Sequence, residues 1–235
     1  MMNYTSEYNR KIEGNDIILT PKKGNPILTL IFLHGMGDSP NGYLDMFDSI
    51  FSPLPKQSKV ILLCAPKGKL TYAQGYETNS WFDILSKGFT NENAYNFNDV
   101  IKNSKKIIDI INEETKSYKG DYSKIFIGGF SQGACVSLHC AFNSPQPIGG
   151  VLALSGVLFP QSISSINDLS SKESTHIFIG HGRFDDVIDI EIAKASYKPI
   201  LGMKNVELHE YPMKHSINEA EEKDIKYFFD KCLNN

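Results

Sequence analysis

The stretch that decides the fold reads Lys124-Ile125-Phe126-Ile127-Gly128-Gly129-Phe130-Ser131-Gln132-Gly133-Ala134. The apolar run before the glycines predicts a strand, and the apolar residues that follow them predict a helix. Gly129 and Gly133 stand two residues on each side of Ser131, where any Cβ would crowd a tight turn. A serine on such a strand–turn–helix connection is held in a strained conformation with its hydroxyl exposed, as in a nucleophile elbow. The alternative is an ordinary glycine-rich turn with a surface serine.

Composition places the chain among ordinary globular proteins. It has 235 residues, of which 41% are hydrophobic and 22% charged, values that suit one α/β domain. The net charge of −3 gives no reason to expect nucleic acid or an anionic membrane as a partner. No apolar run approaches the roughly 20 residues that a membrane span needs, so no stable membrane insertion is expected. The first ten residues lack the apolar core of a secretory signal, which favours a cytoplasmic location.

The four cysteines give no sign of a disulfide framework or a metal site. Cys64, Cys135, Cys140 and Cys232 fall inside apolar patterns without paired spacing. His139 stands near two of them on one predicted helix and could be imagined as a metal ligand, but the spacings typical of zinc sites are absent. We therefore expect no metal, no cofactor and reduced, mostly buried thiols in the cytoplasm.

Apolar runs alternate with helical patterns along the whole chain, and no internal repeat interrupts them. The segments that predict strands are 16–20 as an edge strand, then 27–33, 59–65, 124–127, 150–155, 176–180 and 206–211. The segments that predict helices are 97–111, with Asn98 as N-cap and Gly120 as a stop, then 134–142, 190–203 and a final helix to Cys232 opened by a Ser216–Glu219 capping box. Strands without a polar face are buried on both sides, as in a parallel sheet. Residues 1–235 are therefore predicted to form one α/β domain, with a mostly parallel central sheet and helices on both faces.

One long irregular region, residues 67–97, stands apart from this alternation. It contains the only tryptophan of the chain, in Ser80-Trp81-Phe82-Asp83. Loops of this length inside a compact domain are usually lids or binding loops. We therefore expect this region to cover a substrate.

A serine hydroxyl needs an adjacent base to become a nucleophile, and the base needs a third group to orient it. For that third group, Asp185 and Asp186 follow the predicted strand at 176–180, and Asp189 is close. Asp185 is third after Gly182, in the spacing typical of this turn, and is preferred over Asp186. The alternative is that these acids are solvated or cap the next helix.

Of the six histidines, His215 is the preferred base. It lies just past the last predicted strand and before the capped helix, at the carboxyl edge of the sheet. His181 and His34 end strands on the same edge and are its rivals, although His34 is expected to shape the glycine-rich loop after it. His209 and His139 are interpreted as packing residues.

An acyl-transfer site also needs two backbone N–H groups aimed at the developing negative charge. One is expected from Gln132, the residue after the serine, and the other from Met36 in the early glycine-rich loop. Gly35 and Gly37 would let that loop approach a substrate closely.

Together these residues resemble the acyl-protein thioesterases and their carboxylesterase and lysophospholipase relatives, within the α/β-hydrolase fold. The resemblance spans almost the whole chain and rests on five motifs in the order of that family: His34-Gly35-Met36-Gly37-Asp38-Ser39, Ser80-Trp81-Phe82-Asp83, Gly129-Phe130-Ser131-Gln132-Gly133, His181-Gly182-Arg183-Phe184-Asp185 and Met213-Lys214-His215-Ser216. The chain departs from the family in three places. It has Asp186 where the family usually has Pro, a segment before His215 that is one residue short and lacks a Gly, and a divergent region at 67–97.

The resemblance implies a role for each site residue. Ser131, Asp185 and His215 take the triad roles, and the N–H groups of Met36 and Gln132 donate to the oxyanion. By this resemblance Trp81 belongs to the acyl-binding loop. The apolar residues of the region 67–97 are expected to cover a fatty acyl chain, namely Leu70, Tyr72, Trp81, Phe82 and Phe89.

The implied activity is hydrolysis of acyl thioesters, with S-palmitoyl or other long-chain groups on protein cysteines as substrates, through an acyl-serine intermediate. A general carboxylesterase or lysophospholipase acting on small oxygen esters is the alternative. A non-catalytic lipid-binding relative is an alternative of another class, disfavoured because the Ser, Asp and His set is intact. The sequence does not decide between a monomer and a weak homodimer.

Overall fold

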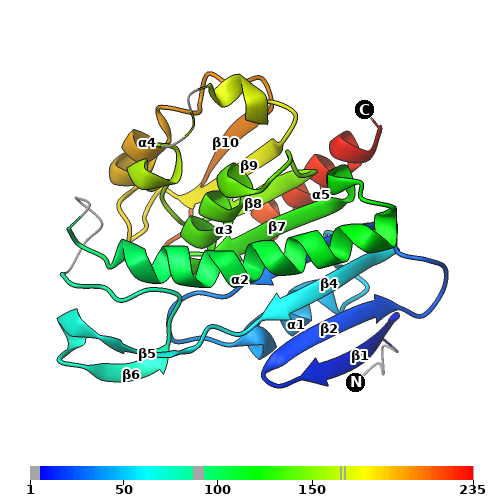
Figure 1. The fold of residues 1–235 in the computed structure, drawn as a ribbon, viewed down its shortest axis with the longest axis horizontal. Helices are drawn as coiled ribbons and strands as arrows, with labels where there is room; N and C mark the ends of the chain where they lie inside the picture. Colours follow the sequence, from blue (N-terminus) through cyan, green and yellow to red (C-terminus); the bar gives the residue numbers. More distant parts are fainter. Residues whose placement is uncertain (1–5, 87–92, 165, 167, 235) are drawn as a thin grey trace.

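The computed structural model describes residues 6–86, 93–164, 166 and 168–234. In this part of the chain an eight-stranded sheet forms the centre of the molecule, in the order β1-β2-β4-β3-β7-β8-β9-β10 (Figure 1). Its strands are β1 (Tyr8–Glu13), β2 (Asp16–Pro21), β3 (Leu28–Leu33), β4 (Ser58–Leu63), β7 (Ile125–Phe130), β8 (Gly150–Leu154), β9 (His176–Gly182) and β10 (Val206–Tyr211). The β1–β2 and β2–β4 pairs are antiparallel, and the five remaining pairs are parallel.

The prediction that residues 16–20 form an edge strand was wrong. They form β2, which pairs with β4 on one side and with β1 on the other. The edge strand at this end of the sheet is β1, and it escaped detection because only Tyr8 of its six residues is buried. Its exposed polar side chains suit an edge, where they discourage pairing with another chain.

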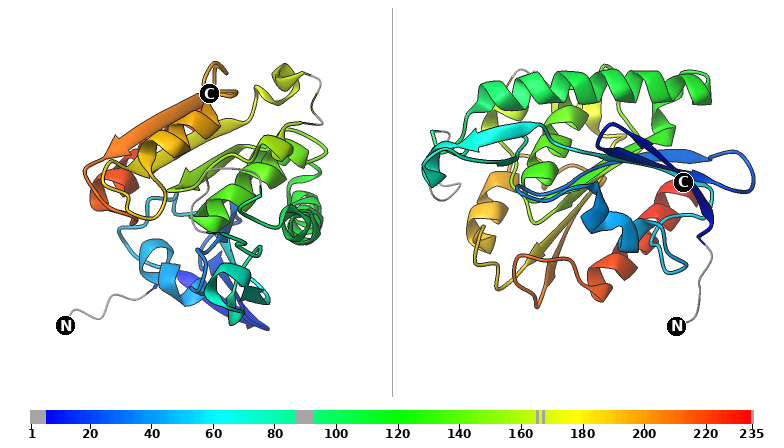
Figure 2. Two further views of the ribbon diagram at one scale, coloured as in Figure 1. Left: turned by 90° about the vertical axis from the view of Figure 1, so that its left-hand side faces the viewer. Right: turned by 90° about the horizontal axis from the view of Figure 1, so that it is seen from below.

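Helices cover both faces of the sheet (Figure 2). One face carries α2 (Phe97–Thr115) and α3 (Gln132–Asn143), and the other carries the short α1 (Leu44–Phe47) and α5 (Glu219–Asn234). The helix α4 (Ile190–Tyr197) packs on the α2–α3 side through Ala193 and Tyr197 and is shorter than the predicted 190–203.

The central strands contribute alternate residues to two separate cores. Ile127 of β7 and Val151 of β8 pack under α2 and α3, whereas Phe126 and Leu152, their neighbours in sequence, pack against α1 and α5. All four side chains are at most 1% exposed. Burial on both faces is the reason that these strands have no polar side, and it confirms the predicted mostly parallel sheet.

The region 67–97 contains more regular structure than the sequence indicated. Its first part is an antiparallel hairpin of β5 (Lys67–Leu70) and β6 (Tyr76–Asn79), with Gln74 and Gly75 at positive φ in the connection. The short strands escaped detection because only Leu70 and Thr78 of their eight residues are buried, so apolar alternation is weak. Residues 87–92 lie outside the described residues.

Two helix starts differ from the predicted ones. The N-cap of α2 is Asn96, whose side chain accepts a hydrogen bond from the Asn98 N–H, so the predicted cap lies inside the helix. At α5 the Oδ1 atom of Asn218 accepts a hydrogen bond of 2.9 Å from the Glu221 N–H, and the helix begins at Glu219. The Ser216–Glu219 capping box was therefore wrong, because Asn is as good a cap as Ser and Asn218 stands two residues closer to the helix, directly before Glu219.

Glu221 is an unusual acid, because it is fully buried at the first turn of α5. Neither carboxylate oxygen has a hydrogen-bond partner among the described residues. The side chain fits against β9 only because residue 180 is glycine, since a Cβ there would lie 1.9 Å from Glu221 Oε1. Burial, followed by the nearby Glu222 and Asp224, raises the pKa of Glu221 to about 8.

This raised pKa predicts a pH dependence of stability. In the unfolded chain Glu221 ionises near its ordinary pKa of 4.5, whereas in the folded protein it keeps its proton to about pH 8. The stabilisation is therefore complete below pH 4.5 and is lost as the pH rises to about 8. We expect the free energy of unfolding of the protein to fall, relative to that of Glu221→Gln, by about 1.4 kcal/mol per pH unit in this window.

Urea unfolding of the protein and of Glu221→Gln across this pH range measures the difference. Glu219→Gln, a change at an exposed acid of the same helical turn, is the matched control and should behave like the unchanged protein. Parallel stability curves for Glu221→Gln and the unchanged protein would contradict the buried, protonated state.

Candidate active site

Ser131 occupies a strained turn between β7 and α3. Its backbone has φ 55° and ψ −118°, a conformation that a non-glycine residue rarely adopts. The turn is held because the Ser131 N–H donates to Leu154 O at 2.8 Å. A Cβ on Gly129 would lie 2.4 Å from the carbonyl carbon of Gly133. The crowding predicted for this turn is confirmed, and the role of the serine stays a prediction.

The loops after β9 and β10 bring an acid and a histidine together. These strands are adjacent and parallel, with Gly182 opposite Tyr211. Gly182 lets the two loops cross in contact, because a Cβ there would lie 2.4 Å from the carbonyl oxygens of Met213 and Lys214. Beyond the crossing, the ring nitrogen Nδ1 of His215 lies 2.7 Å from Oδ2 of Asp185.

Asp185 is held as an anion by the groups around it. Its Oδ1 accepts the N–H groups of Val187 and Ile188 at 2.9 and 2.8 Å, and its Oδ2 lies 2.7 Å from His215 and 3.3 Å from Nε2 of His181. Burial raises the pKa of this carboxyl, but the hydrogen bonds from His181, His215 and the two backbone groups outweigh burial and hold the pKa well below its usual range. An ionised Asp185 keeps the proton of His215 on Nδ1 and leaves Nε2 free as a base.

The other two acids point elsewhere. Asp186 forms an exposed ion pair with Lys214, with Oδ2 and Nζ 2.9 Å apart. Asp189 caps α4 by accepting the Glu191 N–H at 2.8 Å. Of the three candidates, only Asp185 contacts His215 in the described part of the chain.

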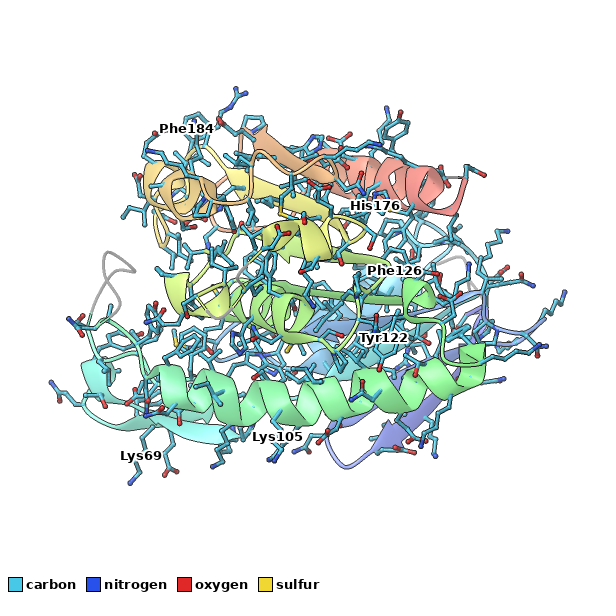
Figure 3. The ribbon with its side chains drawn as sticks, turned by 45° about the horizontal axis from the view of Figure 1, so that its top comes forward. Lys69, Lys105, Tyr122, Phe126, His176 and Phe184 are labelled. Carbon is cyan, nitrogen blue, oxygen red and sulfur yellow. The ribbon has the colours of Figure 1, made fainter. Side chains whose placement is uncertain are left out.

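His215 lies beside the serine turn. Its ring packs on the ring of Phe130, the residue before Ser131, with 4.7 Å between the centroids. The His215 side chain is 13% exposed, so the ring is held by packing while one edge stays accessible. The neighbouring Phe184 points away from the molecule and is 65% exposed (Figure 3).

The rival histidines are engaged in structural contacts. Nε2 of His34 accepts the Ala65 N–H at 3.0 Å, so its proton is on Nδ1, which lies 2.6 Å from Gly35 O. Burial lowers the pKa of His34 and keeps the ring neutral. His181 is fully buried, and its Nε2 donates to Ile188 O at 2.8 Å. These contacts agree with the expectation that His34 shapes its loop.

The two remaining histidines of the prediction pack against aromatic rings. His139 contacts Phe97 edge-on at 5.2 Å, and its Nδ1 lies 3.0 Å from Ser162 Oγ. His209 stacks on Phe178 with 4.8 Å between the ring centroids. Both were interpreted as packing residues, and these contacts agree with that interpretation.

The predicted oxyanion donors flank the serine. The loop after β3 approaches it closely, since a Cβ on Gly35 would lie 3.5 Å from Ser131 Cβ. The next residue, Met36, is half-buried, and its N–H donates no hydrogen bond to any described residue. Gln132 is the first residue of α3, where backbone N–H groups have no partner within the helix. Their roles as oxyanion donors stay predictions.

The predicted acyl-binding residues are buried in this structure. Leu70 and Trp81 are each 3% exposed, and Phe82 is 1% exposed. The Phe82 ring packs against Phe159 and Tyr95. Contact of these three residues with a substrate stays a prediction, and it requires that the region around them move.

Sequence reasoning missed the side chain of Gln132, which it treated only as a backbone donor. This side chain is 1% exposed and binds the backbone of residues 81 and 82. The sequence signal that could have shown this is a long polar side chain at the start of an otherwise apolar helix. When such an amide is buried, it needs hydrogen-bond partners.

The described residues contain no group of three or more His, Cys, Asp or Glu side chains that could hold a metal ion. Cys135 and Cys140 are fully buried, and burial raises the pKa of the Cys135 thiol to about 12. None of the helices in the described ranges is long and apolar enough to cross a membrane.

Comparison with known proteins adds to this geometry. The family model described as Phospholipase/Carboxylesterase matches residues 15–233. Acyl-protein thioesterase 1 of Debaryomyces hansenii is 36% identical over 217 residues, which cover 87% of this chain and 90% of that protein. Acyl-protein thioesterase 1 of Mycosarcoma maydis is 33% identical over 238 residues, which cover 92% of this chain and 96% of that protein.

Solved structures share the fold. SOBER1 of Arabidopsis thaliana superposes with a TM-score of 0.76 at 26% identity, over 88% of this chain and 99% of that one. Acyl-protein thioesterase 2 of Zea mays has the same TM-score of 0.76 at 21% identity, over 94% of this chain and all of that one, a likeness of fold alone. The predicted α/β-hydrolase architecture is thereby confirmed.

The contacts of the two adjacent acids predict different effects on hydrolysis of an activated ester. Asp185→Asn leaves a neutral acceptor that no longer holds the proton of His215 on Nδ1, so we expect kcat to fall by about 10³–10⁴-fold. Asp186→Asn removes only an exposed ion pair, and kcat should stay within about twofold. Steady-state kinetics of the two variants measure both effects. Equal losses, or the larger loss at Asp186, would overturn the assignment.

Proposed function

The chain belongs to the phospholipase/carboxylesterase family, and we propose that it cleaves acyl thioesters, with long-chain acyl groups on protein cysteines as its substrates. The observation that carries this proposal is the Asp185–His215 hydrogen bond of 2.7 Å beside the strained Ser131. The relatives named acyl-protein thioesterase 1 support the substrate class.

The first half of the reaction makes an acyl-serine. Nε2 of His215 takes the Ser131 hydroxyl proton while Oγ attacks the thioester carbonyl carbon. The carbonyl oxygen becomes negatively charged, and the N–H groups of Met36 and Gln132 stabilise it. When the C–S bond breaks, the imidazolium gives its proton to the departing thiolate. Asp185 stabilises that imidazolium throughout.

The second half consumes water. His215 takes a proton from a water molecule, whose oxygen attacks the acyl carbon of Ser131. The second tetrahedral intermediate uses the same two N–H groups. Its collapse breaks the bond to Oγ, returns the proton to Ser131 and releases the fatty acid. Apart from the substrate and this water molecule, each step uses only side chains and backbone groups of this chain.

We assign the acyl chain to the region 67–97. Leu70, Trp81 and Phe82 are apolar, and a hydrophobic channel there would gain about 0.8 kcal/mol for each methylene that it buries. Because these three side chains are buried, the residues that cover them have to move before a long chain can reach them. Phe89, named with them as part of the cover, lies outside the described residues.

A carboxylesterase or lysophospholipase acting on oxygen esters is the second candidate. It is supported by the matching family model, described as Phospholipase/Carboxylesterase, and the site acts on the carbonyl and the acyl side in the same way whether sulfur or oxygen leaves. A non-catalytic lipid-binding role is disfavoured by the Asp185–His215 pair beside Ser131, a geometry that lipid binding alone does not need.

We propose that the protein works in the cytoplasm, which agrees with its four free cysteines. Acylated proteins or small acyl esters are its partners as substrates, without nucleic acid and without stable insertion into a membrane.

Paired thioesters and oxygen esters of the same acyl groups, from acetyl to palmitoyl, test the proposed substrate class. We expect kcat/KM to rise with chain length and to be higher for each thioester than for its oxygen ester, because the proposed channel binds methylenes and a thiolate leaves readily. Higher values on short oxygen esters throughout would favour the carboxylesterase.

Ser131→Ala is the control for this series. Without Oγ no acyl-serine forms, so hydrolysis of every substrate and labelling by a fluorophosphonate should both disappear. Unchanged turnover by Ser131→Ala would rule out the proposed mechanism whatever the substrate preference.

A further inference from the structure

A short strap, residues 79–82, runs between the serine turn and the loop that carries Met36. It begins at the last residue of β6 and lies almost wholly in the interior, since Ser80, Trp81 and Phe82 are between 1% and 5% exposed. No catalytic step described above uses it. Its hydrogen bonds nevertheless reach both sides of the proposed oxyanion hole.

One end of this connection is the side-chain amide of Gln132. Its Oε1 accepts the Trp81 N–H at 2.9 Å, and its Nε2 donates to Phe82 O at 2.9 Å and to Ser80 Oγ at 3.1 Å. The orientation of the amide is fixed, because a backbone N–H can only donate and a carbonyl oxygen can only accept. The strap is thus tied to the residue whose own N–H is one proposed oxyanion donor.

The other end of the connection is the loop after β3. The indole Nε1–H of Trp81 donates to His34 O at 2.8 Å, and the Gly37 N–H donates to Asn79 O at 2.8 Å. These two loop residues stand on either side of Met36. The segment that carries the second proposed donor is therefore anchored to the strap before and after it.

We propose that the Gln132 side chain is a positioning residue that sets the spacing of the two oxyanion donors. It does so through the strap, which connects α3 to the loop carrying Met36. The inference rests on the proposed function, in which these two N–H groups bind the oxyanion. It goes further by giving the side chain a role in the reaction, separate from that of its backbone.

The expected effect is large because oxyanion stabilisation depends steeply on geometry. Loss of one donor costs about 10²–10³-fold in kcat, and a displacement of about 1 Å can cost about 10²-fold. The hydrogen bonds that hold the strap lie in the interior, where few alternative partners exist. A strap released from Gln132 would let the Met36 loop shift relative to α3.

Gln132→Met tests the proposal, because Met has a similar shape and cannot form the three hydrogen bonds. We expect kcat/KM on an activated ester to fall by about 10–100-fold, with KM changed by less than about threefold. Affinity for an alkylboronic acid, whose tetrahedral adduct with a serine imitates the transition state, should fall by a similar factor.

Asn143→Leu is the matched control on the same helix. Its Nδ2 donates to His139 O and to Ser162 O, both at 2.9 Å, far along α3 from the strap. We expect Asn143→Leu to lower the melting temperature to an extent comparable with Gln132→Met. Its boronic acid affinity and its kcat/KM should stay within about twofold of the unchanged protein.

Trp81→Phe tests the strap at its contact with the loop after β3. It replaces Gln132→Met as the test if Gln132→Met does not fold. It removes the indole N–H that holds His34 O while keeping an aromatic ring. It should reproduce the joint loss of kcat/KM and boronic acid affinity. Where both single variants fold, the double variant should lose less than the product of the two single losses, since both act through one strap.

A folded Gln132→Met or Trp81→Phe with unchanged boronic acid affinity would overturn the proposal. So would a loss of the same size in Asn143→Leu, which would show a general effect of stability. Boronic acid binding by the unchanged protein separates this inference from the proposed function. If the unchanged protein binds the probe and the variants bind equally well, only the inference fails; if the unchanged protein does not bind it, both fail.

Discussion

The close approach of β3 to the first turn of α3 is the constraint on which the site depends. A Cβ on Gly133 would lie 2.0 Å from Leu33 O and 2.8 Å from His34 O, so the two backbones are in direct contact. This contact sets the loop that carries Met36 against the turn that carries Ser131. Any larger residue at position 133 would push the two proposed oxyanion donors apart. The strain at Ser131 is sustained because it stands between two elements buried at the centre of the sheet.

A second close contact completes the site at the other half of the sheet. Gly182 lets the loop after β10 cross the loop after β9, and the crossing sets His215 against Asp185. Each contact lies at the carboxyl edge of the parallel strands, the edge where open α/β sheets place their sites. The fold thus supplies the proposed nucleophile, the proposed base and its proposed orienting acid from three loops at this edge of the sheet. Electrostatics then follow from packing, because the buried Asp185 stays ionised through the hydrogen bonds of His181, of His215 across this crossing, and of two backbone N–H groups of its own loop.

The sequence was informative where burial leaves a strong pattern. Strands buried on both faces appear in the sequence as continuous apolar runs. The tight turns appear as glycines, at positions where a Cβ would clash with neighbouring backbone. The polar strand β1 and the hairpin β5–β6 left no such pattern, because most of their side chains face solvent. Helix starts were misplaced by about two residues, since Asn and Ser cap equally well and packing decides between them. The hydrogen bond between Gln132 and Trp81 joins residues 51 positions apart, and no local sequence pattern predicts which residue is the partner.

The central claim is that acyl groups pass through Ser131, and trapping that intermediate tests it most directly. The protein would be mixed with a medium-chain acyl thioester, quenched in acid within one turnover, digested and measured by mass spectrometry. The account predicts that the peptide containing Ser131 gains the mass of the acyl group before steady state and loses it when substrate is exhausted. Turnover with no acyl group on that peptide, or with the acyl group on another residue, would contradict the account.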